Sequence, residues 1–240
     1  MSDGLGISNF VDSFKNEAKI VGVMVGIVTK NDSANDGDKP GFGRVKVKIP
    51  LIGMTESNWA RIASFMAGKE RGAFFLPEEG DEVLVAFENG DVNRPYIIGS
   101  LWNGKDAPPE TNSDGKNNTR VIKSRSGHTV QFFDKKDEEK IIIKSAKGHW
   151  IQMDDKSGSE AIQITDKSGN NKIVISTKDN KVSINSAKDI EISAPKGKLV
   201  LNAQNIEIKA SADAKIEASA GMNLKASANM TIKGATVNIN

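Results

Sequence analysis

The fold is decided by residues 182–240, which read in blocks of eight: VSINSAKD, IEISAPKG, KLVLNAQN, IEIKASAD, AKIEASAG, MNLKASAN, MTIKGATV, and a final NIN. The eighth place of each block is Asp, Gly or Asn, except in the last full block. The third place is always aliphatic, and its occupants are Ile184, Ile192, Val200, Ile208, Ile216, Leu224 and Ile232. Apolar and polar residues alternate within a block, so the pattern predicts short strands separated by turns.

A helix is the alternative, because Ala, Lys and Glu are common in this stretch and favour helices. A helix would place Ile206 and Ile208 on opposite faces, whereas a strand places both on the same face. The alternation therefore favours strands.

An eight-residue strand spans only about 26 Å when extended, and a single-chain solenoid generally needs longer coils to enclose an interior. Three chains wound around one axis solve this problem and also remove exposed strand edges. We therefore predict a homotrimer with the third-place aliphatic residues as its core and with Ala at the fifth place near the axis. Lys188, Lys196 and Lys198 interrupt the alternation, and we expect their charged groups at the corners of the prism.

The first half of the chain has a different composition, because no aromatic residue follows Trp150. Residues 20–103 contain about five short apolar segments with turn signals such as Asn89-Gly90 between them, which predicts a small closed β-barrel. The aromatic residues expected to fill its core are Trp59, Phe65, Phe74, Phe75, Phe87, Tyr96 and Trp102.

The remaining segments complete a four-part organisation. Residues 1–19 are a short arm, residues 104–119 (GKDAPPETNSDGKNNT) have the composition of an exposed linker, and residues 120–240 form the repetitive element. Before the octads this element has longer repeats, in which the dipeptide Gly-His occurs at 127–128 and again at 148–149.

Charge and cysteine content exclude several classes of protein. Residues 1–119 carry 13 basic and 17 acidic side chains, and residues 120–240 carry 20 and 14, so no strongly basic region is present. The chain has no cysteine, which excludes disulfides and thiol chemistry. It shows neither a signal peptide nor an apolar run of about 18 residues, so we expect synthesis and assembly in the cytoplasm.

The sequence contains no pattern that strongly indicates a catalytic or metal-binding site. His128 and His149 could contribute to a metal site, but a hydrogen-bonded histidine repeated with the structural unit is the favoured interpretation. Asp32, Asp36 and Asp38 lack the spacing of a calcium loop. The carboxylates at Glu78, Glu79, Asp81 and Glu82 are typical of a solvated turn rather than a glycosidase pair. We predict no catalytic residues, no metal and no cofactor, and hence no enzyme.

Four ordered motifs carry a family resemblance: GRVKVKIP at 43–50, WARI at 59–62, FFLPEEGDEVLVAF at 74–87 and GDVNRPYIIG at 90–99. Together they closely resemble the OB-fold domain of phage baseplate assembly protein V and of VgrG spike proteins. Ser126-Gly127-His128 and Phe132-Phe133-Asp134 resemble the start of the β-helix of that family.

The resemblance implies a homotrimeric central spike: an OB-fold collar that carries an intertwined triple-stranded β-helix and punctures an envelope mechanically. It also implies a phage tail, tailocin or injection-system particle as the final location, a separate hub protein at the collar, and no nucleic acid. A PAAR-type tip protein is expected on a platform made by Ala235, Val237, Asn238, Ile239 and Asn240. An OB-fold nucleic-acid-binding protein and a cell-wall-degrading baseplate component remain the alternatives.

Overall fold

The computed structural model describes residues 19–37 and 41–239 and is all-β, with two short 3-10 turns at Pro50–Ile52 and Glu88–Gly90. The chain divides into two units, Met1–Ala187 and Lys188–Asn240. Most of the predicted arm, together with Asp38 and Asn240, lies outside the described residues.

The first sheet is a five-stranded barrel in the order β2-β1-β6-β7-β3. Its strands are β1 (Val23–Lys30), β2 (Lys46–Lys48), β3 (Arg61–Ile62), β6 (Glu82–Phe87) and β7 (Pro95–Leu101). All pairs are antiparallel except β3 with β7. Val45 and Ala60 close the barrel, since each donates its backbone N–H to the carbonyl of the other, at 3.2 and 2.8 Å. A two-stranded hairpin, β4 (Ala67–Gly68) with β5 (Arg71–Gly72), extends from this domain.

Small and β-branched side chains fill the barrel. Its buried residues are Val28, Val45, Val47, Ile49, Ala60, Val83, Val85, Phe87 and Ile97. Alternate residues of β6 point inward, while the intervening Leu84 and Ala86 are half-buried. Gly26 allows β1 to approach closely, because a Cβ at that position would lie 2.9 Å from the Val85 side chain.

The prediction of an aromatic core was wrong. Of the expected residues only Phe87 is buried, whereas Phe65, Phe74, Phe75 and Trp102 are 87, 75, 65 and 68% exposed. A barrel of five short strands encloses little volume, so Val and Ile at alternating positions fill it and large rings remain on the surface.

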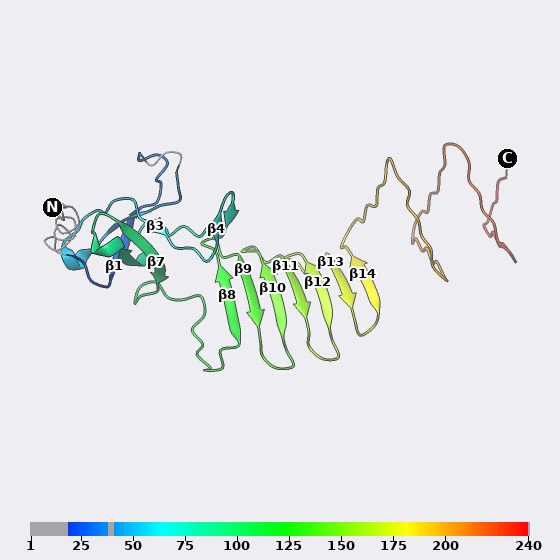
Figure 1. Ribbon diagram of the computed structural model, residues 1–240. Coiled ribbons are helices and arrows are strands. Elements are labelled where there is room, and N and C mark those ends of the chain that lie inside the picture. Colours follow the sequence, from blue (N-terminus) through cyan, green and yellow to red (C-terminus); the bar gives the residue numbers. More distant parts are fainter. Residues whose placement is uncertain (1–18, 38–40, 240) are drawn as a thin grey trace, which may run out of the picture. The chain divides into compact units, whose positions relative to one another are not determined.

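The second sheet is a seven-stranded antiparallel meander in chain order, in which neighbouring strands lie side by side (Figure 1). Its strands are β8 (Thr119–Lys123), β9 (Thr129–Phe133), β10 (Lys140–Lys144), β11 (Trp150–Asp154), β12 (Ala161–Thr165), β13 (Lys172–Ser176) and β14 (Lys181–Asn185). Each strand has five residues and pairs with its neighbour without a bulge.

Residues 188–239 contain no strand, although their sequence alternates as the sheet does. Bends recur at 187–188, 204, 211–212, 219–220, 227–228 and 235–236, with a turn at 195–196. These positions correspond to the sixth and seventh places of the octads. Figure 1 accordingly draws this segment as a trace without arrows.

Candidate functional site

One face of the second sheet carries two parallel rows of side chains, one residue per strand, and all are apolar except Arg120 on β8. The pairing register places directly opposite one another the members of the first row: Ile122, Val130, Ile143, Ile151, Ile164, Ile173 and Ile184. The second row consists of Arg120, Phe132, Ile141, Met153, Ile162, Ile175 and Val182. Because alternate residues of a strand share a face, the two rows form one surface. We call it the apolar face.

The apolar face is uncovered within the chain. From β10 onward Ile141 is half-buried, and the other large side chains of the face are between 39% (Ile151 and Ile173) and 65% (Val182) exposed. A shallow hollow of about 550 Å³ lies over it, lined by Ile143, Ile151, Ile164 and Ile173 among others. The central row of the other face is mixed and consists of Val121, Gln131, Ile142, Gln152, Gln163, Val174 and Ser183. A continuous apolar surface of this size is typical of an interaction site.

The residues predicted to form the trimer core are exposed in the single chain. From Ile184 to Ile232 their exposed fractions are 58, 68, 74, 76, 74, 69 and 64%. Ile184 is both the last member of the first row and the first of the octad series. The outward positions carry ion pairs, with Lys209 Nζ 2.6 Å from Glu207 Oε1 and Lys215 Nζ 2.6 Å from Glu217 Oε1. Lys188, Lys196 and Lys198 are exposed.

The predicted tip platform is also exposed where the structure describes it. Val237 and Ile239 are 48 and 87% exposed, and Ala235 and Asn238 are exposed as well. Asn240 lies outside the described residues.

Both histidines lie in turns between strands, where their rings accept backbone hydrogen bonds. His128 Nδ1 accepts the Ala146 N–H at 3.2 Å, and His149 Nδ1 accepts the Lys167 N–H at 3.3 Å. Within residues 19–37 and 41–239, no group of three or more His, Cys, Asp or Glu side chains could hold a metal ion.

The acidic residues considered in the sequence analysis accept hydrogen bonds within turns and form ion pairs. Asp81 Oδ2 accepts the Glu78 N–H at 2.8 Å, and Glu78 Oε1 lies 2.8 Å from Arg125 Nη1. Asp36 Oδ2 lies 3.0 Å from Lys46 Nζ and 3.1 Å from Lys30 Nζ. Hydrogen bonds from these two ammonium groups lower the pKa of Asp36, and the bond to Asp36 raises the pKa of Lys46.

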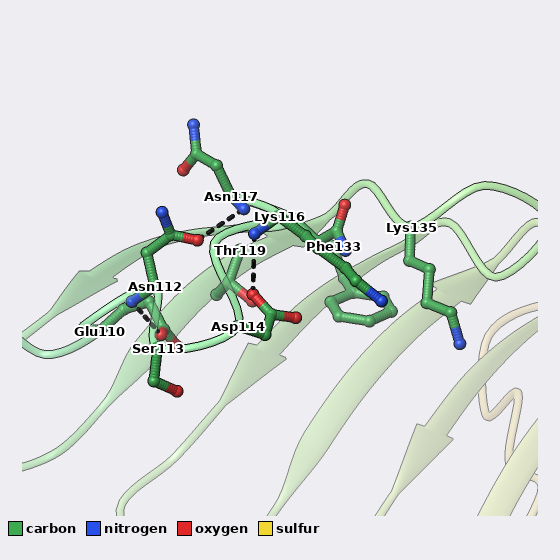
Figure 2. Close-up of a pocket in the computed structure, with 10 residues that line it drawn as sticks. Glu110, Asn112, Ser113, Asp114, Lys116, Asn117, Thr119, Phe133 and Lys135 are labelled. Atoms are coloured by element: carbon green, nitrogen blue, oxygen red, sulfur yellow. Dashed lines mark hydrogen bonds between the residues drawn. The ribbon is translucent and has the colours of Figure 1, made fainter.

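The connection before β8 lines a polar pocket of about 320 Å³ (Figure 2). Its polar side chains accept hydrogen bonds from the backbone of the same loop. Glu110 Oε1 accepts the Asn112 N–H at 2.9 Å, and Asn112 Oδ1 accepts the Asn117 N–H at 2.6 Å. Asp114 Oδ1 accepts the Lys116 N–H at 3.0 Å. The side-chain acceptors of this pocket thus order the connection that the sequence predicted to be an exposed linker.

Aromatic faces on the barrel are covered by cations of the same chain. The Arg61 guanidinium lies 4.8 Å from the centre of the Tyr96 ring, and Lys46 Nζ lies 5.0 Å from that of Trp59. These two rings are therefore occupied on one side, which reduces the surface on which nucleic-acid bases could stack.

Sequence reasoning predicted the octad core but missed the apolar face as a site. The signal was present, because Ile141 and Ile143, Ile162 and Ile164, and Ile173 and Ile175 repeat the same i, i+2 pattern. Their alignment into rows depends on the register between strands, which the pattern of one strand does not contain.

Comparison with known proteins identifies the barrel. Residues 24–102 match the family described as the type VI secretion system/phage-baseplate injector OB domain. The chain is 32% identical over 110 residues to the type VI secretion system spike protein VgrG3 of Vibrio cholerae, a match covering 42% of this chain and 11% of that protein. It is 32% identical over 106 residues to the spike protein VgrG1c of Pseudomonas aeruginosa, covering 41% and 15%.

These matches confirm the predicted resemblance to VgrG-like baseplate and spike proteins, and the all-β class with an OB domain is confirmed too. The chain is also 30% identical over 109 residues to a protein named actin cross-linking toxin VgrG1 of Vibrio cholerae, and the match covers only 10% of that toxin. In each case the matched segment is a small part of the relative. No helix in the described part of the chain is long and apolar enough to cross a membrane.

Proposed function

We propose that the chain is the structural central spike of a contractile tail or injection machine and acts as a homotrimer. The observation that carries this proposal is the apolar face together with the octads that follow it. Both present aliphatic rows that one chain leaves exposed, and Ile184 belongs to both series. The similarity of the barrel to spike proteins of type VI secretion systems supports the same role.

Three copies would cover these surfaces by turning their apolar faces toward a common axis. Full burial of one Ile, Val or Leu side chain contributes roughly 1.5–3 kcal/mol before the loss of chain entropy is counted. Seven octad layers with three such side chains each would give a stiff rod that unfolds slowly. The octads would form a triple-stranded β-helix in which each strand obtains its hydrogen-bond partners from the other chains.

The rod would transmit force rather than catalyse a reaction. Puncture of an envelope requires stiffness and slow unfolding, and the hydrogen bonds of the meander together with the octads would provide both. A turbidity assay on purified peptidoglycan should therefore show no clearing. Clearing that tracks with the purified chain would favour the alternative of a cell-wall-degrading baseplate component.

Two partners belong to this proposal. A separate hub protein would contact the OB domain, and a PAAR-type tip protein would bind the apolar positions around Val237 and Ile239, which are exposed. Val237→Asp with Ile239→Asp should abolish capture of a PAAR-type protein, whereas Lys233→Asp should not. Equal capture by both variants would contradict the proposed tip contact. Before delivery to the target envelope, the spike would be part of a phage tail, tailocin or injection-system particle.

The nucleic-acid alternative has a direct test. Fluorescence anisotropy with single-stranded DNA at low salt should show no binding, because residues 1–119 carry four more acidic than basic side chains, 17 against 13. Tight, salt-sensitive binding would instead favour an OB-fold nucleic-acid-binding protein.

A further inference from the structure

The two edges of the seven-stranded meander are built differently. On one edge lie the turns after β9, β11 and β13, and backbone groups link each of these to its neighbour. The Asp134, Asp155 and Thr177 N–H groups donate to carbonyls of the adjacent connections, at 2.8, 2.9 and 3.0 Å. We call this the backbone edge. The turns after β8, β10 and β12 lie on the opposite edge, where side chains make the links.

On that second edge, the turns after β8 and β10 have the same internal structure. In the first, the Ser124 N–H donates to the His128 carbonyl at 2.9 Å, and the His128 N–H donates to Ser124 Oγ at 3.1 Å. In the second, Ser145 and His149 make the same two bonds at 2.8 and 3.0 Å. Each turn is therefore closed by its own serine, which leaves the imidazole ring available for a neighbour.

Each imidazole reaches the next turn along the edge. His128 Nδ1 accepts the Ala146 N–H and His149 Nδ1 accepts the Lys167 N–H, both from the second residue of the following turn. The turns also touch, because a Cβ at Gly127 would lie 3.7 Å from Ala146 Cβ, and one at Gly148 would lie 3.5 Å from Lys167 Cβ. Both glycines have positive φ, 89° and 96°, which side chains disfavour.

The third turn makes the same link with a different residue. Asn171 Oδ1 accepts the Ala187 N–H at 2.9 Å and the Ser186 hydroxyl at 3.1 Å. Three successive links thus use His, His and Asn, whose common property is a neutral acceptor atom placed just after the turn. The position requires an acceptor rather than an imidazole as such.

We infer that His128 and His149 link successive turns of this edge by hydrogen bonds when their rings are neutral, and that protonation of the rings breaks these links. A backbone N–H can only donate, so Nδ1 must carry no proton and the ring must be the Nε2–H tautomer. A protonated imidazole carries protons on both nitrogens and has no acceptor, so the link is lost. Histidine is the side chain that gains its charge between pH 5 and 8.

Cations predominate in the turns and at the adjoining strand ends, and the charged groups there are Lys123, Arg125, Lys144, Lys147, Asp166, Lys167 and Lys172. Arg125 is paired with Glu78. Asn171 does not titrate, so the third link should persist at acidic pH and limit the opening to the first two turns.

The test uses the untagged full chain with 15N-labelled histidine, whose spectrum contains only these two rings. At pH 8 both rings should be Nε2–H tautomers with unprotonated Nδ1, and at pH 5 both should be doubly protonated. Hydrogen exchange at the Ala146 and Lys167 amides, corrected for the intrinsic effect of pH, should be about three- to tenfold faster at pH 5, as for the loss of one net hydrogen bond. The Asp134 and Asp155 amides of the backbone edge serve as internal controls and should not change.

Two double variants distinguish the loss of the histidine hydrogen bonds from other effects of acidic pH on the chain. His128→Asn with His149→Asn keeps a neutral acceptor, as in the third turn, and should make exchange at Ala146 and Lys167 independent of pH after the same correction. His128→Phe with His149→Phe should give fast exchange at both pH values with an unchanged backbone edge. An Nδ1–H tautomer at pH 8, or equal corrected exchange of the wild type at pH 5 and 8, would overturn the inference. These readouts concern turns within one chain, so their failure would leave the proposed spike function standing.

Discussion

The seven-stranded meander and the octad segment have the same alternation but different hydrogen bonding. In the meander, strands begin every nine to eleven residues, from Thr119 to Lys181, and each strand pairs with the next in the same chain. In residues 188–239 the repeat shortens to eight, and the described residues form no strand. A repeat that is one to three residues shorter is thus associated with the loss of pairing inside the chain.

The difference has a simple geometric reason. A repeat of nine to eleven residues provides a five-residue strand and a turn long enough to reverse the chain, as in the meander. An octad with a bend at its sixth and seventh places leaves too few residues for the same reversal and strand. In the proposed trimer its backbone groups would be satisfied by the other chains. In the proposed trimer, partner copies would cover only side chains of the meander, whereas they would supply both backbone and side-chain contacts to the octads.

The largest expected effect is a charge at the octad core. Ile208→Asp would bury three carboxylates in one layer of the trimer, and each unpaired buried charge costs several kcal/mol. We expect loss of the trimer on a mass measurement and loss of exchange protection throughout residues 188–239. Lys209→Asp places the same charge at the next, outward position and should change stability by no more than about 0.5 kcal/mol. A trimeric Ile208→Asp variant with protected octads would refute the assigned core.

The same charge on the meander should have a smaller and different effect. Ile164→Asp introduces a carboxylate on the apolar face between Ile151 and Ile173. Association should weaken, but the strands should remain protected from exchange because their hydrogen bonds lie within the chain. Gln163→Asp, on the opposite face of the same strand, is the matched control and should leave association unchanged. Equal effects of the two variants would show that the apolar face is not covered.

A cavity in the core of the barrel should affect neither the meander nor the octad segment. Val85 is fully buried, and Val85→Ala removes two methyl groups from the core, which should destabilise the barrel by about 2 kcal/mol. The mass in solution and the exchange pattern of residues 119–239 should stay the same. Thermal unfolding with the near-ultraviolet signal of the barrel's aromatic residues would measure the change, and a change of mass would indicate that barrel and rod are coupled.

The smallest expected effect is the pH dependence of the stability that one turn, the turn of Asp166, contributes. The Ser168 hydroxyl and the Asn171 amide groups hydrogen-bond to the Asp166 carboxylate and lower its pKa from 3.8 to about 2. Because the folded pKa lies below the ordinary value, this carboxylate stabilises the fold above about pH 4, and the contribution disappears as the pH falls toward 2. Asp166→Asn should therefore narrow the difference in melting temperature between pH 5 and pH 2.5. Asp155→Asn, in a turn of the backbone edge, should leave that difference unchanged.

Much of the fold could be predicted from the sequence. Turn signals such as Asn89-Gly90 and alternation such as Val83, Val85 and Phe87 located the barrel, because both are local properties of the chain. The octad period reappears in the backbone as bends every eight residues. Size and apolar character alone suggested that Phe74 and Phe75 were core residues, but a narrow barrel leaves them on its surface.

The candidate site was harder to predict because it depends on relations between strands. Ile151 lies opposite Ile143 and Ile164 only because the flanking turns fix the register. The histidine links likewise connect residues 18 positions apart, such as His128 and Ala146, through stacked turns. Neither relation is contained in the local pattern, although the repeated Gly-His dipeptide indicated that the two turns are equivalent.

The central claim, that the octads fold only with partner chains, is tested most directly by the mass of the full chain in solution. Three copies of the 25.8 kDa chain give about 77 kDa. We predict that mass, with residues 188–239 protected from hydrogen exchange to the same degree as the meander. A monomer of 25.8 kDa that keeps these residues protected would contradict the account.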